Sequence, residues 1–229
     1  MNIAIILAAG KSKRMSKIDK IFYEIKDKPL IFYTISAFEK HPEIRKIILV
    51  AKRKDFKNFF SLIEKYKFKK IMAIVKGRKK RQDSAFNGLK MSEKLGAKSE
   101  DLILFHNGAN PLVSKNEITN VIKAAKKHEA ALVAKPAIDT IKEVNKNRFI
   151  VRTINRKKIF LAQTPQVIEF VLAKKAFEKA EKDNFQGTDD VSLVERLGKR
   201  VKIVPCSYKN IKVTTRDDLK IIRAFLKNI

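Results

Sequence analysis

The chain has a single cysteine, three histidines and no tryptophan among its 229 residues. One thiol, Cys206, cannot form an internal disulfide or a multi-cysteine metal site. The histidines, His41, His106 and His128, are too scattered to indicate a zinc centre. We therefore expect no metal site built from protein side chains. The chemistry must come from charged groups, backbone amides or an added ion such as Mg²⁺.

Long apolar runs are absent as well. No stretch of about 18 uncharged apolar residues occurs, and no basic segment precedes the strand-like residues 1–7. These absences predict a soluble, cytoplasmic protein. Because 45% of the residues are apolar, the chain can bury one large core, and no repeat or Pro/Gly-rich linker divides it. Residues 1–229 are expected to form a single domain.

Acidic residues are scarce, at 24 against 52 lysines and arginines, which gives a formal net charge of +28. Such a charge attracts nucleic acid, phosphates and other anions. However, 40 of the 52 basic residues are lysine, and most fall at outward positions of amphipathic helices such as 115–128. This pattern favours a solvated lysine-coated surface over a nucleic-acid interface.

Short β-branched runs alternate with helical patterns along the chain, which predicts a mostly parallel sheet with helices on both faces. The expected fold is α/β, doubly wound and Rossmann-like. Ser114 and Glu117 form a capping-box pattern at the start of one expected helix. Strands are expected at 3–7, 47–50, 71–75, 102–105, 131–134 and 201–204, and helices near 30–40, 55–66, 80–94, 115–128, 168–182, 189–197 and 216–228.

Residues 136–160 interrupt this alternation of strands and helices. Two strand-like runs, 138–143 and 149–154, flank the polar turn 145–147. A hairpin this late in a doubly wound domain is expected to project as a β-arm. Two interpretations remain open at this point, an antiparallel pair at the sheet edge and a dimerisation arm.

Three of the seven glycines, Gly10, Gly77 and Gly108, closely follow the ends of expected strands. Ligands bind at the carboxyl ends of strands in open α/β sheets, and glycine permits close backbone approach or a positive φ angle there. Residues 7–15 read Leu-Ala-Ala-Gly-Lys-Ser-Lys-Arg-Met, with Lys20 beyond. This loop is neither a Walker A loop nor a GxGxxG motif. It is typical of sugar-phosphate nucleotidyltransferases.

Further segments extend this likeness over essentially the whole chain. They read Gly-Arg-Lys-Lys-Arg-Gln-Asp-Ser (77–84), Phe-His-Asn-Gly-Ala-Asn-Pro (105–111), Asp-Thr-Ile-Lys (139–142), Gln-Thr-Pro-Gln (163–166), Thr-Asp-Asp-Val-Ser-Leu-Val-Glu (188–195) and Asn-Ile-Lys-Val-Thr (210–214). In this order they resemble the signature blocks of the 2-C-methyl-D-erythritol 4-phosphate (MEP) cytidylyltransferase family.

The resemblance implies an enzyme that transfers CMP from CTP to MEP and releases pyrophosphate, in isoprenoid precursor synthesis. It further implies Mg²⁺ as cofactor and a homodimer through the 136–160 arm, with Thr140 and Arg156 carried on the partner's arm. The residues that it assigns are Arg14 and Lys20 for catalysis; Ala8, Ala9, Gly10, Lys11, Gly77, Arg81, Ser84, Asn107 and Ala109 for the nucleotide; and Thr140, Arg156, Thr164 and Lys212 for the acceptor.

Four positions depart from the family pattern. Asn107 stands in place of a signature aspartate that helps organise metal and substrate, and Asn110 in place of an arginine. Arg78 replaces the second glycine of the pyrimidine loop, and Asp19 replaces a proline before Lys20. An amide keeps an oxygen but loses the anionic charge that Mg²⁺ prefers. Metal binding is therefore expected to rest mainly on the triphosphate.

Two alternatives remain. Ribitol-5-phosphate or other polyol-phosphate cytidylyltransferases share most of these loops, although they tend to have Ala-Gly-Gly at positions 8–10 and match residues 188–195 less well. The second alternative, from another class, is a non-catalytic polyanion-binding protein on a decayed enzyme fold, which the charge of +28 permits.

Overall fold

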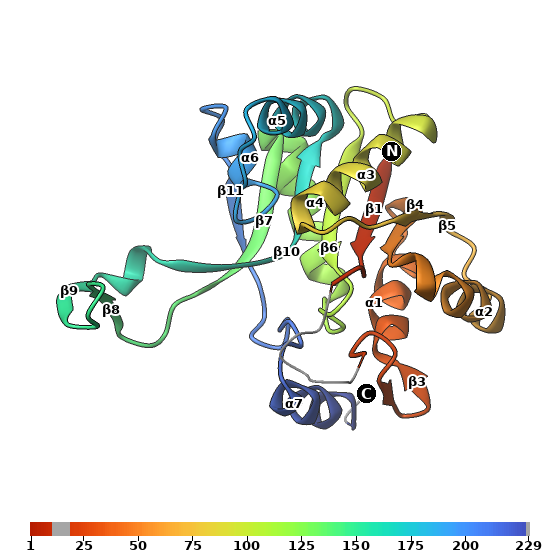
Figure 1. Ribbon diagram of the computed structural model, residues 1–229, viewed down its shortest axis with the longest axis horizontal. Helices are drawn as coiled ribbons and strands as arrows, with labels where there is room; N and C mark the ends of the chain where they lie inside the picture. Colours follow the sequence, from red (N-terminus) through yellow and green to blue (C-terminus); the bar gives the residue numbers. More distant parts are fainter. Residues whose placement is uncertain (11–18, 228–229) are drawn as a thin grey trace.

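The computed structural model describes residues 1–10 and 19–227, without the side chain of Lys227 (Figure 1). Its centre is a seven-stranded sheet in the order β11-β7-β10-β6-β1-β4-β5. The strands are β1 (Asn2–Leu7), β4 (Ile44–Ala51), β5 (Ile71–Lys76), β6 (Leu102–Asn107), β7 (Ala130–Pro136), β10 (Phe160–Glu169) and β11 (Lys202–Pro205).

The strand directions confirm the expected mostly parallel sheet. β1 runs parallel to β4 and β6, β4 to β5, and β7 to β11. β10 is the exception, because it lies antiparallel between β6 and β7. The sequence did not indicate this strand, since the polar residues Gln163, Thr164 and Gln166 interrupt its apolar pattern. In the structure its pairing with β7 shifts register between Ala162 and Gln166.

Helices cover both faces of the sheet, as a doubly wound fold requires (Figure 1). Successive residues of β1 point to opposite faces: Ala4 and Ile6 join one core cluster, and Ile3 and Ile5 join the other. The first cluster includes α1 (Leu30–Glu39), α2 (Phe56–Tyr66), α4 (Lys115–His128) and α7 (Arg216–Lys227); the second includes α3 (Arg81–Lys94), α5 (Phe170–Lys182) and α6 (Ser192–Glu195).

A small hairpin that the sequence did not indicate precedes α1. It pairs β2 (Glu24–Ile25) with β3 (Lys28–Pro29) in antiparallel fashion. Its turn residues, Lys26 and Asp27, have φ angles of 50° and 59°. Positive φ at both central residues matches the right-handed twist of the paired strands. A short 3₁₀ helix, η2 (Arg53–Asp55), leads into α2.

The expected hairpin at 136–160 is present and projects from the body (Figure 1). Its antiparallel strands are β8 (Ile141–Val144) and β9 (Ile150–Ile154), followed by the 3₁₀ helix η3 (Arg156–Lys158). β8 begins three residues later than expected. Large apolar side chains are exposed here, including Phe149 at 70% and Ile150 at 62%.

No helix in the described part of the chain is both long and apolar enough to cross a membrane.

The capping box expected at the start of α4 is confirmed. The Ser114 hydroxyl accepts from the Glu117 amide at 3.2 Å, and the Glu117 carboxylate accepts from the Ser114 amide at 2.7 Å. The other carboxylate oxygen of Glu117 accepts from the Ser207 amide at 2.6 Å. One buried side chain thus joins the helix start to the segment after β11.

We predict that Ser114→Ala lowers the free energy of unfolding by about 1 kcal/mol, because an amide at the helix start loses its acceptor. Urea denaturation measures this change. Ser61→Ala is the control, since Ser61 is exposed inside α2 and caps nothing. Equal stability of the two variants would contradict the capping role.

Candidate active site

Loops that follow β1, β5 and β6 meet at the carboxyl edge of the sheet and enclose a cavity of about 490 Å³. The segments before α1 and after β11 complete its wall. The cavity is lined by Leu7, Ala9, Gly10, Lys20, Ile21, Arg78, Lys79, Lys80, Arg81, Ser84, Asn107, Ala109, Lys212 and Thr214. Six of these residues are lysine or arginine, and no acidic residue of the described chain is among them. An anionic ligand suits such a cavity.

Most of the residues assigned from the sequence come together here. The cavity wall includes Ala9, Gly10, Lys20, Arg81, Ser84, Asn107, Ala109 and Lys212. Gly77 lines an adjoining cavity that shares Ala9 with this one. Ala8 is buried, and its amide donates to the Val50 carbonyl at 2.7 Å. Lys11 and Arg14 lie outside the described residues.

Thr140 and Arg156 are not among the lining residues. Both are exposed on the arm, where the Arg156 guanidinium donates to the Ile138 carbonyl. The arm extends away from the body of its own chain (Figure 1). These two side chains are therefore not brought to the cavity by the chain that carries them.

Gly77 is required by close approach, and neither Gly77 nor Gly108 has a positive φ angle. A Cβ atom at Gly77 would lie 2.2 Å from the Cβ of Ala9, so the loops after β1 and β5 touch there. A Cβ atom at Gly108 would lie 2.9 Å from Ile31 Cδ1. A Cβ atom at Gly10 would meet nothing within 4 Å in the described chain. That residue thus leaves open space at the cavity wall.

Lys20 is hydrogen-bonded to the segment of the cavity wall that carries Lys212. Its ammonium group donates to the Val213 carbonyl at 2.9 Å, and the Val213 amide donates to the Ala109 carbonyl at 2.8 Å. The loop after β6, the segment that carries Lys212 and the segment that carries Lys20 are thereby held together. Two cations from distant parts of the sequence, Lys20 and Lys212, line one cavity as a result.

Ser84 closes the loop after β5 upon itself. Its hydroxyl accepts from the Arg78 amide at 2.8 Å and lies 3.0 Å from the Lys80 carbonyl, to which it can donate. The hydroxyl is thus occupied by the loop backbone and shapes the cavity wall.

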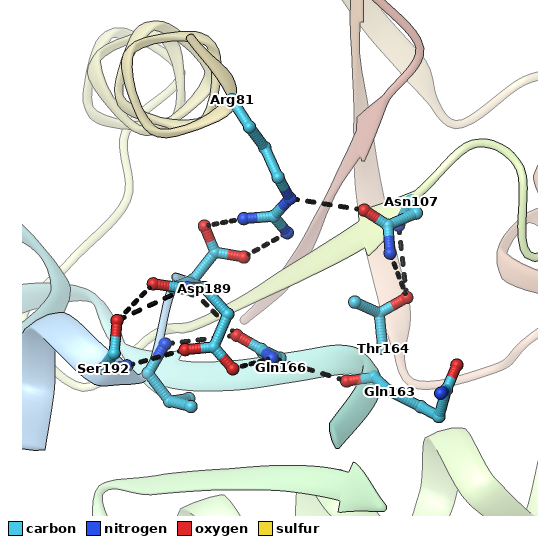
Figure 2. A network of polar contacts seen from close by, with 9 residues as sticks. Arg81, Asn107, Gln163, Thr164, Gln166, Asp189 and Ser192 are labelled. Carbon is cyan, nitrogen blue, oxygen red and sulfur yellow. Dashed lines mark hydrogen bonds and ion pairs between the residues drawn. The ribbon is translucent and has the colours of Figure 1, made fainter. Parts of the chain in front are cut away.

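Arg81 forms a bidentate ion pair with Asp190, at 2.8 and 2.6 Å, and donates from Nε to Asn107 Oδ1 at 3.3 Å (Figure 2). Asp190 is only 1% exposed, whereas 31% of the Arg81 side chain faces solvent. Burial disfavours the charge on Arg81, but the Asp190 and Asp189 carboxylates more than offset it and raise the arginine pKa. Arg81 therefore stays charged at the cavity wall.

The turn that carries Asp190 is held by Gln166 on β10 (Figure 2). Gln166 Oε1 accepts from the Asp190 and Val191 amides at 2.9 and 3.1 Å, and its Nε2 donates to Asp189 at 2.7 Å. Sequence reasoning gave no role to Gln166, Asp189 or Asp190. The signal that could have pointed to Asp189 and Asp190 was that two carboxylates are adjacent in a chain of charge +28.

Thr164 is buried at 3% exposure. Its hydroxyl accepts from the Asn107 amide at 3.2 Å and lies 3.4 Å from Asn107 Nδ2 (Figure 2). Thr164 thus supports Asn107, but it is not among the residues that line the cavity.

His106 and Asn110 fill the interior beneath the cavity. His106 is fully buried, and its Nε2 lies 3.0 Å from the Asn110 carbonyl. Burial lowers the His106 pKa to about 4, so the ring is neutral at pH 7 and can donate this hydrogen bond. Asn110 Nδ2 donates to Asn210 at 3.1 Å. These contacts fix the loop after β6.

Comparison with known proteins shows which family this chain belongs to. The model of the 2-C-methyl-D-erythritol 4-phosphate cytidylyltransferase (IspD) family matches residues 2–228. A curated member from Caldanaerobacter subterraneus subsp. tengcongensis is 41% identical over 230 residues, which cover 99% of this chain and 100% of the relative. A member from Syntrophus aciditrophicus is 41% identical and covers 98% and 95%. The chain belongs to the MEP cytidylyltransferase family.

Solved structures of the family have a similar fold. The 4-diphosphocytidyl-2C-methyl-D-erythritol synthase of Anaerococcus prevotii has a TM-score of 0.85 and 31% identity, and the alignment covers 99% of this chain and 96% of that one. The MEP cytidylyltransferase of Francisella tularensis has a TM-score of 0.81 and 31% identity, covering 97% and 98%. These findings make the chain a nucleotidyltransferase and are not consistent with either alternative kept open from the sequence.

The structure shows what two departures from the MEP cytidylyltransferase pattern contact. Asn107 accepts from Arg81, an interaction that needs an oxygen but no negative charge. Asn110 is fully buried among other amides, and its Oδ1 has no hydrogen-bond partner in the described structure.

No group of three or more His, Cys, Asp or Glu side chains that could hold a metal ion comes together among the described residues. Mg²⁺ prefers anionic oxygen ligands, but the oxygen of Asn107 is neutral and already accepts from Arg81.

We predict that Asp190→Asn lowers the free energy of unfolding by about 2 kcal/mol. The amide turns an N–H toward Arg81 and leaves its charge partly uncompensated. The full cost of breaking a buried pair, about 3–5 kcal/mol, is reduced because Arg81 faces the cavity. The variant should also bind CTP more weakly, since Arg81 is no longer held.

Urea denaturation and CTP titration measure the two effects. Glu143→Gln is the matched control, because it makes the same carboxylate-to-amide change in the exposed pair with Arg152. A stability loss of similar size in both variants would contradict the positioning role of Asp190.

Proposed function

We propose that this chain transfers CMP from CTP to MEP and releases pyrophosphate, in the synthesis of isoprenoid precursors. The observation that carries the proposal is the cation-lined cavity at the carboxyl edge of the sheet. It is built by the loops in which the family signatures lie.

In the proposed reaction, an oxygen of the MEP 4-phosphate attacks the α-phosphorus of CTP. A new phosphorus–oxygen bond forms, and the bond to the bridging oxygen breaks, so that pyrophosphate leaves with the electron pair. Negative charge increases on the non-bridging oxygens during this step. Fixed cations beside them stabilise it. We assign this role to Lys20 and to Arg14.

The base is proposed to lie where the loops after β1 and β5 touch. A Cβ at Gly77 would already collide with Ala9, and we propose that the space above this contact fits a pyrimidine better than a purine. The backbone of Ala8, Ala9 and Gly10 would hold the nucleotide together with Ser84, Asn107 and Ala109, and Lys11 would contribute to the same site. Arg81, held by Asp190, is proposed to contact the nucleotide from the adjoining wall.

Mg²⁺ is proposed as the cofactor, bound mainly by the triphosphate of CTP. When bound, it would neutralise part of the phosphate charge. Lys20 and Lys212 would supply the positive charge that the protein contributes beside it.

We further propose a homodimer in which each arm reaches the active site of the partner. The exposed apolar side chains of the arm, Phe149 and Ile150 among them, would be buried on pairing. Thr140 and Arg156 of one chain would then bind the MEP phosphate beside Lys212 of the other, and Thr164 would support this site through Asn107. A guanidinium suits this task because it can bind phosphate through two parallel hydrogen bonds. A cytoplasmic location and a single domain also remain predictions.

The substrate assignment is tested by measuring pyrophosphate release with each NTP against MEP and ribitol 5-phosphate. We expect CTP with MEP to give the highest kcat/KM. Lys20→Ala should lower kcat by ~10²–10³ with a smaller effect on the KM for CTP. Lys57→Ala, an exposed change on α2, should leave the rate unchanged. No pyrophosphate release from the parent protein with any pair would refute the proposed function.

Subunit mixing tests the exchanged arm. Lys20→Ala and Arg156→Ala chains are each expected to be nearly inactive. In a mixed dimer, one of the two active sites combines an intact core with an intact arm. Random mixing makes about half of the dimers mixed, so it should restore about a quarter of the parent rate. Chains that carry Lys20→Ala alone, mixed with the double variant, serve as the control and should stay inactive. Proven heterodimers without recovery would show that the arm serves its own chain.

A further inference from the structure

Another cavity, of about 750 Å³, lies apart from the candidate active site. It is bounded by the β2–β3 hairpin, α1, the segment after β6 and α7, and it shares no lining residue with the cation-lined cavity at the sheet edge. We call it the α1–α7 groove. Its volume falls in the range of small-molecule sites, about 300–1,000 Å³.

The walls of the groove are apolar. Phe32, Tyr33 and Ala37 contribute one face of α1, and Phe225 and Leu226 contribute the facing side of α7. All except Leu226 are only partly buried, so their apolar surface is open to a ligand. The Phe32 ring is held by the Tyr66 ring, with centroids 4.4 Å apart. The apolar wall is therefore preformed.

The groove also carries a set of cations, Lys26, Lys28, Lys40, Lys115 and Lys209, and no acidic side chain of the described chain lines it. Two of these ammonium groups lie over wall aromatics: Lys28 is 4.7 Å from the Phe32 centroid, and Lys209 is 5.6 Å from the Phe225 centroid. Positive charge thus stands directly beside apolar surface on both walls. An anion bound there would offset the repulsion between these cations.

We propose that the α1–α7 groove binds a free, single-chain anionic amphiphile, such as an alkyl carboxylate or alkyl phosphate. Its chain lies against Phe32, Ala37 and Phe225, and its head group lies between Lys28 and Lys209. Charge complementarity selects an anion, and the concave apolar walls select an attached chain over a bare inorganic ion.

The groove and the candidate active site lie on different sides of α1. Thr34 donates to the Gly108 carbonyl at 2.9 Å, and Ile31 packs against Gly108, whereas Phe32, Tyr33 and Ala37 face the groove. Both sites are therefore expected to be occupied at once, and CTP should not displace the amphiphile.

The test uses decyl phosphate below its micellar concentration, titrated into the 229-residue protein by calorimetry with and without saturating CTP. We expect saturable binding to one site per chain, unaffected by CTP. Inorganic phosphate and the neutral decyl maltoside should each bind at least about tenfold more weakly. The double variant Lys28→Glu/Lys209→Glu should lose affinity by at least about tenfold, because its head-group cations become anions.

The matched control is Lys57→Glu/Lys175→Glu, which makes the same change in net charge at exposed positions outside the groove. It should bind decyl phosphate like the parent. A second variant, Ala37→Trp, fills the groove and should also weaken binding, with circular dichroism used to verify folding.

Several results would overturn the proposal. Competition by CTP would place the ligand in the candidate active site, and an equal loss in both lysine variants would indicate a general charge effect. Equal affinity for decyl maltoside would remove the role of the cations. Binding only to phosphatidylglycerol vesicles, and not to monomeric decyl phosphate, would indicate a membrane surface instead.

Discussion

The ion pair between Arg81 and Asp190 joins three parts of the chain that are far apart in sequence. Arg81 begins α3, Asp190 lies in the turn before α6, and the Asn107 side chain that also accepts from Arg81 ends β6. Gln166 on the antiparallel strand β10 fixes that turn. An isolated buried charge would be costly, and a complete hydrogen-bond network compensates it. The position of a cation at the cavity wall therefore depends on β10, which lies antiparallel to its neighbours in the central sheet.

The second constraint on the site is the spacing between loops. Ala9 and Gly77 touch so closely that no side chain fits at position 77, and the Gly108 amide donates to the Leu7 carbonyl at 2.9 Å. These contacts draw the ends of β1, β5 and β6 together, so the polar groups of three loops line one cavity. Part of the chain's net charge of +28 lies at this cavity. Six cations line it, and no carboxylate of the described structure does.

The architecture could largely be predicted from the sequence because its strands and helices carry strong, regular patterns. The alternation of 3–7, 47–50 and 71–75 with helices required a mostly parallel sheet, and the Ser114–Glu117 capping box marked the start of α4. β10 escaped prediction, since Gln163, Thr164 and Gln166 are polar residues in a buried strand. Their polarity is explained only by partners elsewhere, such as Asn107 and the turn at Asp189. The β2–β3 hairpin was not predicted either, because its turn has Lys26 and Asp27 at positive φ angles instead of glycine.

By itself, the sequence determined the fold class, the family and most residues that line the cavity, since glycines after strands and signature loops are local features. It left open which groups support these residues. Only the tertiary structure decided that Asp190 holds Arg81 and that Thr164 supports Asn107. Such relations join residues more than 50 positions apart. Hydrogen bonding and packing between them depend on how helices and strands meet in space, which local patterns do not encode.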